Sequence, residues 1–323
     1  MLLSIVAVIL GLVLLVWSAD YFVDHAAIIA RNLGVSTLII GITIIGFGTS
    51  APEILISLFS VFDDTPDLAI GNAIGSNIAN IGLILGATAL FIPLSFNSKL
   101  INREFPILLF ATVLMIWVLW DTHLSFVDGF VLMGFLILSL GYLVRFSKTD
   151  KNDPISVDLE QEIPRDVSTA YALLRTGIGL IILVASSKLL VWGAVNIATF
   201  MGISELIIGL TVVALGTSLP ELAAAIAGAR KGEPDLVMGN VIGSNMFNSL
   251  AVIGLPALLT DFHISPVAIT RDLPVMVGLT VFIYILSRFP RSSCCVITRS
   301  KGLVLLSAFV LYQLFLYYQV VAK

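Results

Sequence analysis

Two short polar stretches interrupt apolar segments of the chain, and each stretch occurs twice. The first reads Gly-Thr-Ser-x-Pro-Glu and covers residues 48–53 and 216–221. Its proline lacks an amide hydrogen, so it removes one helical hydrogen bond and frees a backbone carbonyl. Freed carbonyls inside an apolar segment are tolerated where they line a cavity or bind an ion. The stretch therefore predicts a broken helix that presents hydroxyl, carbonyl and carboxylate oxygens.

Glu53 and Glu221 are the strongest individual signals in the sequence. A carboxylate in the middle of an apolar segment is costly and usually has a function. The alternative is a protonated, structural glutamate that bonds to a neighbouring helix. Recurrence at the same place in two copies of the motif favours the functional interpretation.

The second stretch reads Gly-Asn-x-Ile-Gly-Ser-Asn-x-x-Asn and covers residues 71–80 and 239–248. Its glycines are expected to let helices approach closely, as small residues do in membranes. Asn80 and Asn248 are expected to bind a cation. The other four asparagines could either bind a cation or cap and bridge helices; they are Asn72, Asn77, Asn240 and Asn245.

Hydroxyl, amide, carbonyl and carboxylate oxygens suit hard cations such as Ca²⁺ and Na⁺. Neither stretch contains a histidine or cysteine, which makes zinc and copper poor candidates, and no cofactor is predicted. The cysteines Cys294 and Cys295 are adjacent and are interpreted as free thiols, because neighbouring cysteines rarely bridge each other and lack metal-ligand spacing.

The composition places these motifs in a membrane. Of the 323 residues, 58% are hydrophobic and 12% are charged, and the mean hydropathy is +1.06. Soluble domains carry about 25% charged residues, so the chain is expected to be an all-α polytopic membrane protein. Ten apolar segments are expected, near residues 2–24, 36–60, 68–92, 105–120, 124–146, 169–192, 204–228, 236–258, 273–287 and 302–320.

The ten segments form two similar halves. The register that pairs Gly34 with Gly202 aligns 34–86 with 202–254 without a gap, with 23 identities in 53 positions. The halves are a first five-helix repeat at 1–146 and a second, inverted repeat at 169–323, joined by an acidic cytoplasmic linker at 147–168. The second and seventh helices are the broken ones.

An odd number of helices per repeat requires the two copies to face opposite ways across the membrane. The charges agree, because 13 of the 17 basic residues fall in the loops after helices 1, 3, 5, 7 and 9. By the positive-inside rule those loops are cytoplasmic, and both termini lie outside. Inverted repeats of this kind are typical of secondary transporters.

The doubled pair of motifs resembles the α-repeats of the calcium:cation antiporter superfamily, which includes the sodium/calcium exchangers. The short chain is similar to the bacterial and archaeal members. The resemblance implies that helices 1 and 6 slide across the other eight to alternate access. It also implies the ion ligands, which are Thr49, Ser50, Glu53, Ser76, Asn80, Thr217, Ser218, Glu221, Ser244 and Asn248, with the backbone carbonyls of Gly46 and Ala214.

The resemblance predicts an antiporter of the inner membrane that exchanges Ca²⁺ for Na⁺ or H⁺, rather than an enzyme. Some sodium/calcium exchangers of this family carry an aspartate where this chain has Asn248, so the coupling ion stays open here. A proton-coupled antiporter and a passive cation channel are the alternatives. An intramembrane hydrolase would need a general base such as histidine or lysine beside Ser50 or Ser218, and the motifs contain neither. The expected partners are the ions and the lipid bilayer, with no nucleic acid and no obligate protein partner.

Overall fold

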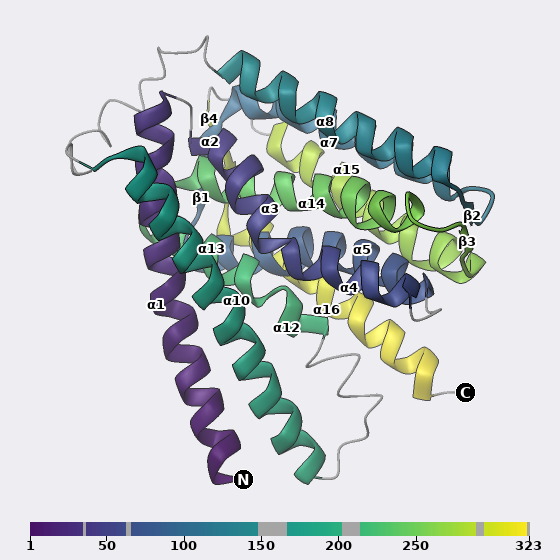
Figure 1. The fold of residues 1–323 in the computed structure, drawn as a ribbon, viewed down its shortest axis with the longest axis horizontal. Helices are drawn as coiled ribbons and strands as arrows, with labels where there is room; N and C mark the ends of the chain where they lie inside the picture. The colour runs from purple at the N-terminus through teal and green to yellow at the C-terminus, as the bar shows by residue number, and fades with distance from the viewer. Residues whose placement is uncertain (35–36, 63–65, 148–166, 202–213, 289–293, 322–323) are drawn as a thin grey trace.

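The fold is taken from a computed structural model of the chain, which describes all residues except 35–36, 63–65, 148–166, 202–213, 289–293 and 322–323. Helices dominate it, and Figure 1 shows them gathered around a central helix, α14. The helices of the first half are α1 (Leu2–Leu33), α2 (Thr37–Ile40), η1 (Gly41–Ile45), α3 (Gly46–Thr49), α4 (Ala51–Phe62), α5 (Pro66–Ala79), η2 (Asn80–Leu85), α6 (Gly86–Phe91), α7 (Ser98–Leu119) and α8 (Phe126–Ser147).

The described helices of the second half follow the same order. They are α10 (Thr169–Phe200), α12 (Ala214–Thr217), α13 (Leu219–Arg230), α14 (Pro234–Ala257), η4 (Ala268–Asp272), α15 (Leu273–Arg288) and α16 (Arg299–Val321). The elements η1, η2 and η4 are short π-helical turns that continue into α-helix. Such turns widen a helix locally and often accompany functional sites.

Seven helices in the described part of the chain are long and apolar enough to cross a membrane, or eight if η1, α3 and α4 form one bent span. The chain is therefore a mostly helical protein with several membrane-spanning helices. Each of the ten predicted apolar segments overlaps a described helix or run of helices. The layout of ten spans in two inverted repeats stays a prediction.

Four of the predicted segments were several residues too short: α7 begins at Ser98 rather than 105, η4 precedes α15 from Ala268 rather than 273, and α1 and α10 extend further at their C-terminal ends. Helix α1 continues past the predicted end at residue 24 to Leu33, and α10 continues past 192 to Phe200. Polar residues ended the hydropathy signal of α1, but His25 Nδ1 bonds the Tyr21 carbonyl within the helix. The helix ends only at Gly34, whose φ of 61° is a left-handed conformation that glycine adopts without a steric penalty.

Four short strands were not expected in an all-α fold. Strand β1 (Leu94–Asn97) pairs antiparallel with β4 (Cys294–Ile297), and β2 (His123–Leu124) pairs antiparallel with β3 (Phe262–His263). Each pair joins a loop of the first half to a loop of the second. Such short strands carry no periodic signal of their own, because their partners lie far away in the sequence.

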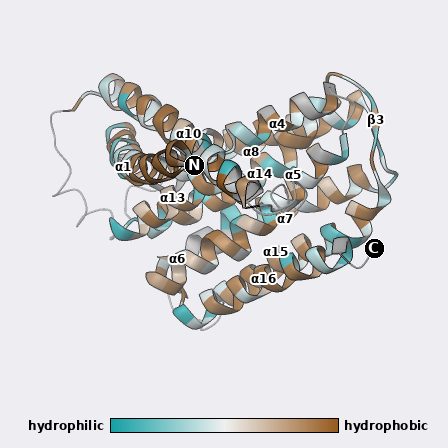
Figure 2. Ribbon diagram, turned by 90° about the horizontal axis from the view of Figure 1, so that it is seen from below, coloured by the Kyte–Doolittle hydropathy of each residue, from teal (hydrophilic) through white to brown (hydrophobic). Residues whose placement is uncertain are grey.

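The burial of α14 defines the centre of the molecule. In an apolar stretch of 18 residues in α14, every residue is buried inside the protein. In the corresponding stretches of α1 and α16, only 33% and 22% of the residues are buried. Large hydrophobic side chains cover the outside of the peripheral helices; Leu2, for example, is 77% exposed. Figure 2 shows this hydrophobic colouring along α1 and α16. Lipid would cover these surfaces in a membrane.

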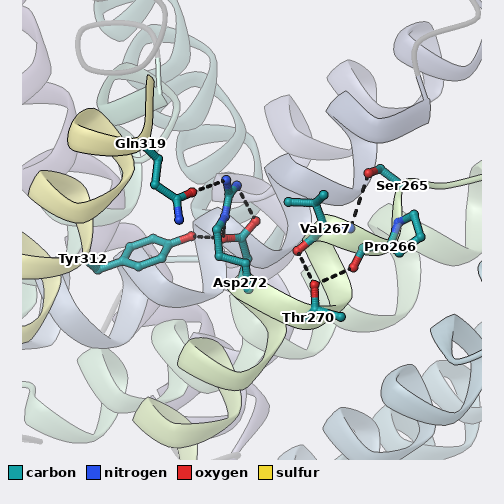
Figure 3. A network of polar contacts seen from close by, with 8 residues as sticks. Ser265, Pro266, Val267, Thr270, Asp272, Tyr312 and Gln319 are labelled. Carbon is teal, nitrogen blue, oxygen red and sulfur yellow. Dashed lines mark hydrogen bonds and ion pairs between the residues drawn. The ribbon is translucent and has the colours of Figure 1, made fainter. Parts of the chain in front are cut away.

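The junction of α15 and α16 illustrates how buried charges are accommodated. Arg271 donates to both carboxylate oxygens of Asp272, at 2.6 and 2.9 Å, and also donates to Gln319. The Tyr312 hydroxyl donates to Asp272 Oδ1 at 2.8 Å, so α16 is tied to η4 (Figure 3). The equivalent pair in the first repeat, Arg103 and Glu104, also forms an ion pair, at 2.8 Å. Each of these two buried carboxylates therefore has a cation beside it.

Candidate cation-binding site

The predicted helix breaks fall at equivalent serines. Ser50 separates α3 from α4 with φ −81° and ψ 0°, and Ser218 separates α12 from α13 with φ −88° and ψ 2°. The η1–α3 segment and α4 meet at an angle of 51°. The Gly-Thr-Ser-x-Pro-Glu motif thus bends the chain just before the glutamate, which stands in the first turn of the next helix.

Helix α14 crosses the first broken helix at very short range, and glycines make this possible. A Cβ atom added to Gly243 would overlap the backbone of Ile42, and one added to Gly41 would lie 2.6 Å from the Leu236 carbonyl oxygen. The predicted role of Gly243 in close helix approach is confirmed. This crossing brings the second motif of α14 against the first motif of α3 and α4. The segment that would make the equivalent crossing against α5 lies outside the described residues.

Thr49 is the most connected side chain of the site. Its hydroxyl donates to the Ile45 carbonyl at 3.1 Å and lies 3.2 Å from Asn240 Oδ1 and 3.4 Å from the Ser244 hydroxyl. Ser244 in turn donates to the Gly46 carbonyl at 3.5 Å. The first motif of the first repeat and the second motif of the second repeat therefore meet at one place inside the protein.

The two glutamates share this place. Glu53 has no exposed surface and Glu221 is 2% exposed, and the charge of Glu53 acts on Glu221. Two buried carboxylates at short range repel each other when both are ionised. A cation between them would remove that repulsion and replace the water that each carboxylate has lost.

Several oxygens of the predicted ligands have no hydrogen-bond partner among the described residues, although they are buried. They are Ser50 Oγ, both carboxylate oxygens of Glu53, Asn80 Oδ1, Glu221 Oε2 and Asn248 Oδ1. A buried polar group without a partner costs about 1–3 kcal/mol, so a cluster of them needs an explanation. Hydroxyl, amide and carboxylate oxygens are the ligand types that Ca²⁺ and Na⁺ take in proteins.

The remaining predicted ligands differ in burial. Ser76 and Ser218 are buried, at 6% and 2% exposure, while Thr217 is half-buried. The Gly46 carbonyl already accepts bonds from the Ser50 amide and the Ser244 hydroxyl. For Ala214 the structure describes only the backbone, at the start of α12.

The asparagines for which the sequence left two roles open form bridges between helices. Asn245 Oδ1 accepts from Asn80 Nδ2 at 2.9 Å, and Asn240 contacts Thr49. Asn77 Nδ2 donates to the Ser249 hydroxyl, and Asn72 Nδ2 donates to the Glu53 carbonyl. These bonds favour the bridging role, in which the four asparagines hold the ligands in place. Ser249 and Met276 on the far side of Asn77 were not identified from the sequence, since neither belongs to a repeated motif.

Histidine and cysteine do not take part in this site. Within the described ranges, no group of three or more histidine, cysteine, aspartate or glutamate side chains could hold a metal ion. The His123 and His263 rings contact each other across the β2–β3 pair, with centroids 4.6 Å apart and planes tilted by 40°. The structure describes only the backbone of Cys294 and Cys295, which lie in β4.

Comparison with known proteins agrees with the geometry. The sequence profile of the family described as "Sodium/calcium exchanger protein" matches residues 3–145 and 171–318. The Inner membrane protein YrbG of Escherichia coli K12 is 42% identical, over 98% of both chains. The Sodium/calcium exchanger MaX1 of Methanosarcina acetivorans is 30% identical, over 96% of this chain and 97% of the relative.

A solved structure extends the similarity to the fold. The sodium/calcium exchanger from Methanococcus jannaschii superposes with a TM-score of 0.81 at 31% identity, over 96% of this chain and 97% of that chain. Exchangers are transporters, so the chain is not an enzyme. It belongs to the sodium/calcium exchanger family, as a short member of the prokaryotic type.

Proposed function

We propose that the protein is a secondary active antiporter that exchanges Ca²⁺ for Na⁺ or H⁺ at a site near the middle of the membrane. One observation carries the proposal: oxygens of Ser50, Glu53, Asn80, Glu221 and Asn248 are buried and lack hydrogen-bond partners in the described part of the chain. These are oxygen ligands for a hard cation, and they come from both sequence repeats.

The proposed ligand set is the one that the sequence predicts. It comprises the side chains of Thr49, Ser50, Glu53, Ser76, Asn80, Thr217, Ser218, Glu221, Ser244 and Asn248 and the carbonyls of Gly46 and Ala214. Support comes from the hydrogen bonds that join Thr49 to Asn240 and Ser244 of the other repeat. Ca²⁺ takes 6–8 oxygens, which a subset of this list can supply.

The charge of the site supports exchange. Two ionised glutamates, Glu53 and Glu221, balance one Ca²⁺ or two monovalent cations. Without a cation, two bare carboxylates would face each other inside the protein, at a high electrostatic cost. The transporter should therefore rarely change between its two access states while the site is empty, and should change readily when the site holds its ions. This asymmetry couples the exit of one ion to the entry of the other.

The proposed arrangement in the membrane has ten helices in two inverted five-helix repeats, 1–146 and 169–323, with 147–168 as a cytoplasmic linker. The gapless repeat alignment and the distribution of basic residues support it. Both termini would then lie outside an inner membrane. The relative YrbG is named an inner membrane protein, in keeping with that location.

The test is Ca²⁺ flux into proteoliposomes under an imposed Na⁺ gradient, and then under an imposed pH gradient at equal Na⁺. We expect uphill Ca²⁺ movement under at least one gradient, and the gradient that drives it identifies the coupling ion. Uphill movement under the pH gradient alone would identify the proton-coupled alternative. Flux that follows only the Ca²⁺ gradient would indicate a channel, and no Ca²⁺ flux under any gradient would refute the proposal.

A further inference from the structure

Helices α1 and α10 form a pair at one side of the molecule, lying side by side along most of their length (Figure 1). Glycines bring them into close contact: a Cβ atom on Gly11 would lie 2.8 Å from the Leu190 amide nitrogen, and one on Gly193 would lie 2.7 Å from the Ser4 carbonyl oxygen. Arg175 also donates to the Tyr21 hydroxyl at 2.7 Å. The two helices are therefore held together as one unit.

The contact between α1 and α13 is of a different kind. A mainly apolar crevice of about 190 Å³ separates parts of the two helices, lined among others by Leu12 and Val16 of α1 and by Leu222 and Ile226 of α13. Helix α13 is rich in alanine, so it presents only shallow ridges to its neighbours. Close packing usually fixes the relative position of two helices through interlocking side chains. Here that constraint is weak.

One ion pair crosses this loosely packed contact. Lys231, at the end of α13, lies with its ammonium nitrogen 2.6 Å from Asp24 Oδ1 on α1. The same nitrogen donates to the Asp20 carbonyl at 3.0 Å. Lys231 thus contacts two successive turns of α1, at residues four apart. A shift of α1 along its own axis by about one helical turn, 5.4 Å, would break both contacts.

We infer that Lys231 and Asp24 form a latch that holds the α1–α10 pair in one of the two access states of the transporter, an inference that rests on the proposed function. Lys231 and Asp24 are positioning residues, since neither belongs to the proposed set of ion ligands. The latch is weak enough to open in every cycle, because the side chains are 26% and 57% exposed and water screens the pair.

The sequence repeat adds a related observation. The repeat alignment pairs Lys231 with Asp63, and the same register continued toward the N-terminus pairs Asp20 with Lys188, so the charges recur with their signs exchanged. Opposite signs at equivalent positions are expected where inverted repeats place them on opposite sides of a membrane. Asp63 lies outside the described residues and forms no part of the proposed latch.

The experiment measures the position of α1 directly and transport separately, in the full-length protein in proteoliposomes. Cys294 and Cys295 are first replaced by serine, and Leu15→Cys, at a residue of α1 that lines the crevice and is 4% exposed, then reports the opening of the α1–α13 crevice through its rate of labelling with a soluble maleimide. We expect Lys231→Met and Asp24→Asn each to change this rate two- to five-fold, and to change the rate of Ca²⁺ exchange by a similar factor. The charge-swapped double variant Asp24→Lys, Lys231→Asp restores the ion pair but not the bond to the Asp20 carbonyl, so both rates should return part of the way to those of the parent.

Arg145→Met is the matched control, because Arg145 is an exposed cation in the last turn of α8. It should leave both rates unchanged. If Lys231→Met destabilises the protein, the same two rates are measured in Lys231→Arg and in the charge-swapped variant instead. Labelling and exchange rates equal to those of the parent in Lys231→Met, or no recovery in the charge swap, would overturn the latch. An absence of transport in the parent protein would refute the proposed function instead, since labelling does not depend on flux.

Discussion

The two halves of the candidate site have nearly the same residues but different hydrogen bonds. On the first side, the Asn80 amide donates to Asn245, and Glu53 has no partner for either carboxylate oxygen in the described part of the chain. On the second side, neither amide atom of Asn248 has such a partner, and Glu221 Oε2 lacks one as well. In the repeat alignment Asn248 corresponds to Asn80 and Asn77 to Asn245, so the equivalent bond would run from the Asn248 amide to Asn77 Oδ1. That oxygen also lacks a partner among the described residues. The two halves therefore differ most clearly at the asparagines: Asn80 is bonded to the other repeat, and Asn248 has no hydrogen-bond partner among the described residues.

The backbone follows the same division. A π-helical turn begins at Asn80, whereas α14 is a regular α-helix through Asn248. A π-turn rotates the residues that follow it relative to those before it, so equivalent side chains point in different directions. A close repeat of ligands in the sequence therefore need not give a symmetric site. One half can hold its ligands rigidly while the other leaves them free to bind.

The largest effect should come from neutralising either glutamate. Glu53→Gln and Glu221→Gln each remove one of the two negative charges that balance the cation, and we expect at least about a hundred-fold loss of Ca²⁺ exchange, equivalent to roughly 3 kcal/mol. Exchange in proteoliposomes measures it, with the exposed Asp121→Asn as control. If one glutamine variant kept the parent rate, the two glutamates could not share one site.

The next effect concerns the helix crossing that joins the halves. Gly243→Ala places a methyl group on the Ile42 backbone, so we expect a loss of roughly 1–3 kcal/mol in unfolding free energy and a lower melting temperature. Gly278→Ala is the control, because no described atom lies within 4 Å of a Cβ there. Equal melting temperatures for the two variants would contradict the close approach.

The asparagines test the asymmetry itself. Asn80→Asp removes the amide donor to Asn245 and leaves two buried acceptors opposed, so we expect a stability loss of about 1–2 kcal/mol. Asn248→Asp breaks no hydrogen bond among the described residues, so it should be milder in stability and act mainly on the ion preference. Thermal melts and the Na⁺ dependence of exchange separate the two effects. Identical behaviour of the two variants would mean that the halves are equivalent.

The smallest effect is expected at Thr49, the side chain that joins the halves. Thr49→Val removes the hydroxyl that reaches Asn240 and Ser244 while keeping the shape of the side chain. We expect about a five-fold weaker apparent Ca²⁺ affinity, consistent with about 1 kcal/mol for one hydrogen bond. Concentration dependence of exchange measures the affinity, and Thr270→Val, on an exposed surface of η4, is the control. An unchanged affinity would remove Thr49 from the site.

Much of the fold could be predicted from the sequence because membranes impose simple rules. Spanning segments must be apolar and must bond their own backbone, so hydropathy located the helices, and Pro52 and Pro220 located the breaks at Ser50 and Ser218. Hydropathy did not predict the end of a helix correctly where the helix continues into polar surroundings, as in α1 beyond Asp24. It also missed the four strands, whose partners are distant in the sequence.

The sequence by itself determined which residue types the site contains, since hard-cation ligands are rare in apolar segments and recur here in two repeated motifs. Only the tertiary structure decided which of them meet and which stay free. The side-chain partners of Asn80 and Thr49 come from the other repeat, where no local pattern can specify them. The same holds for Lys231 and Asp24: both charges are visible in the sequence, but their contact depends on how α1 packs against α13.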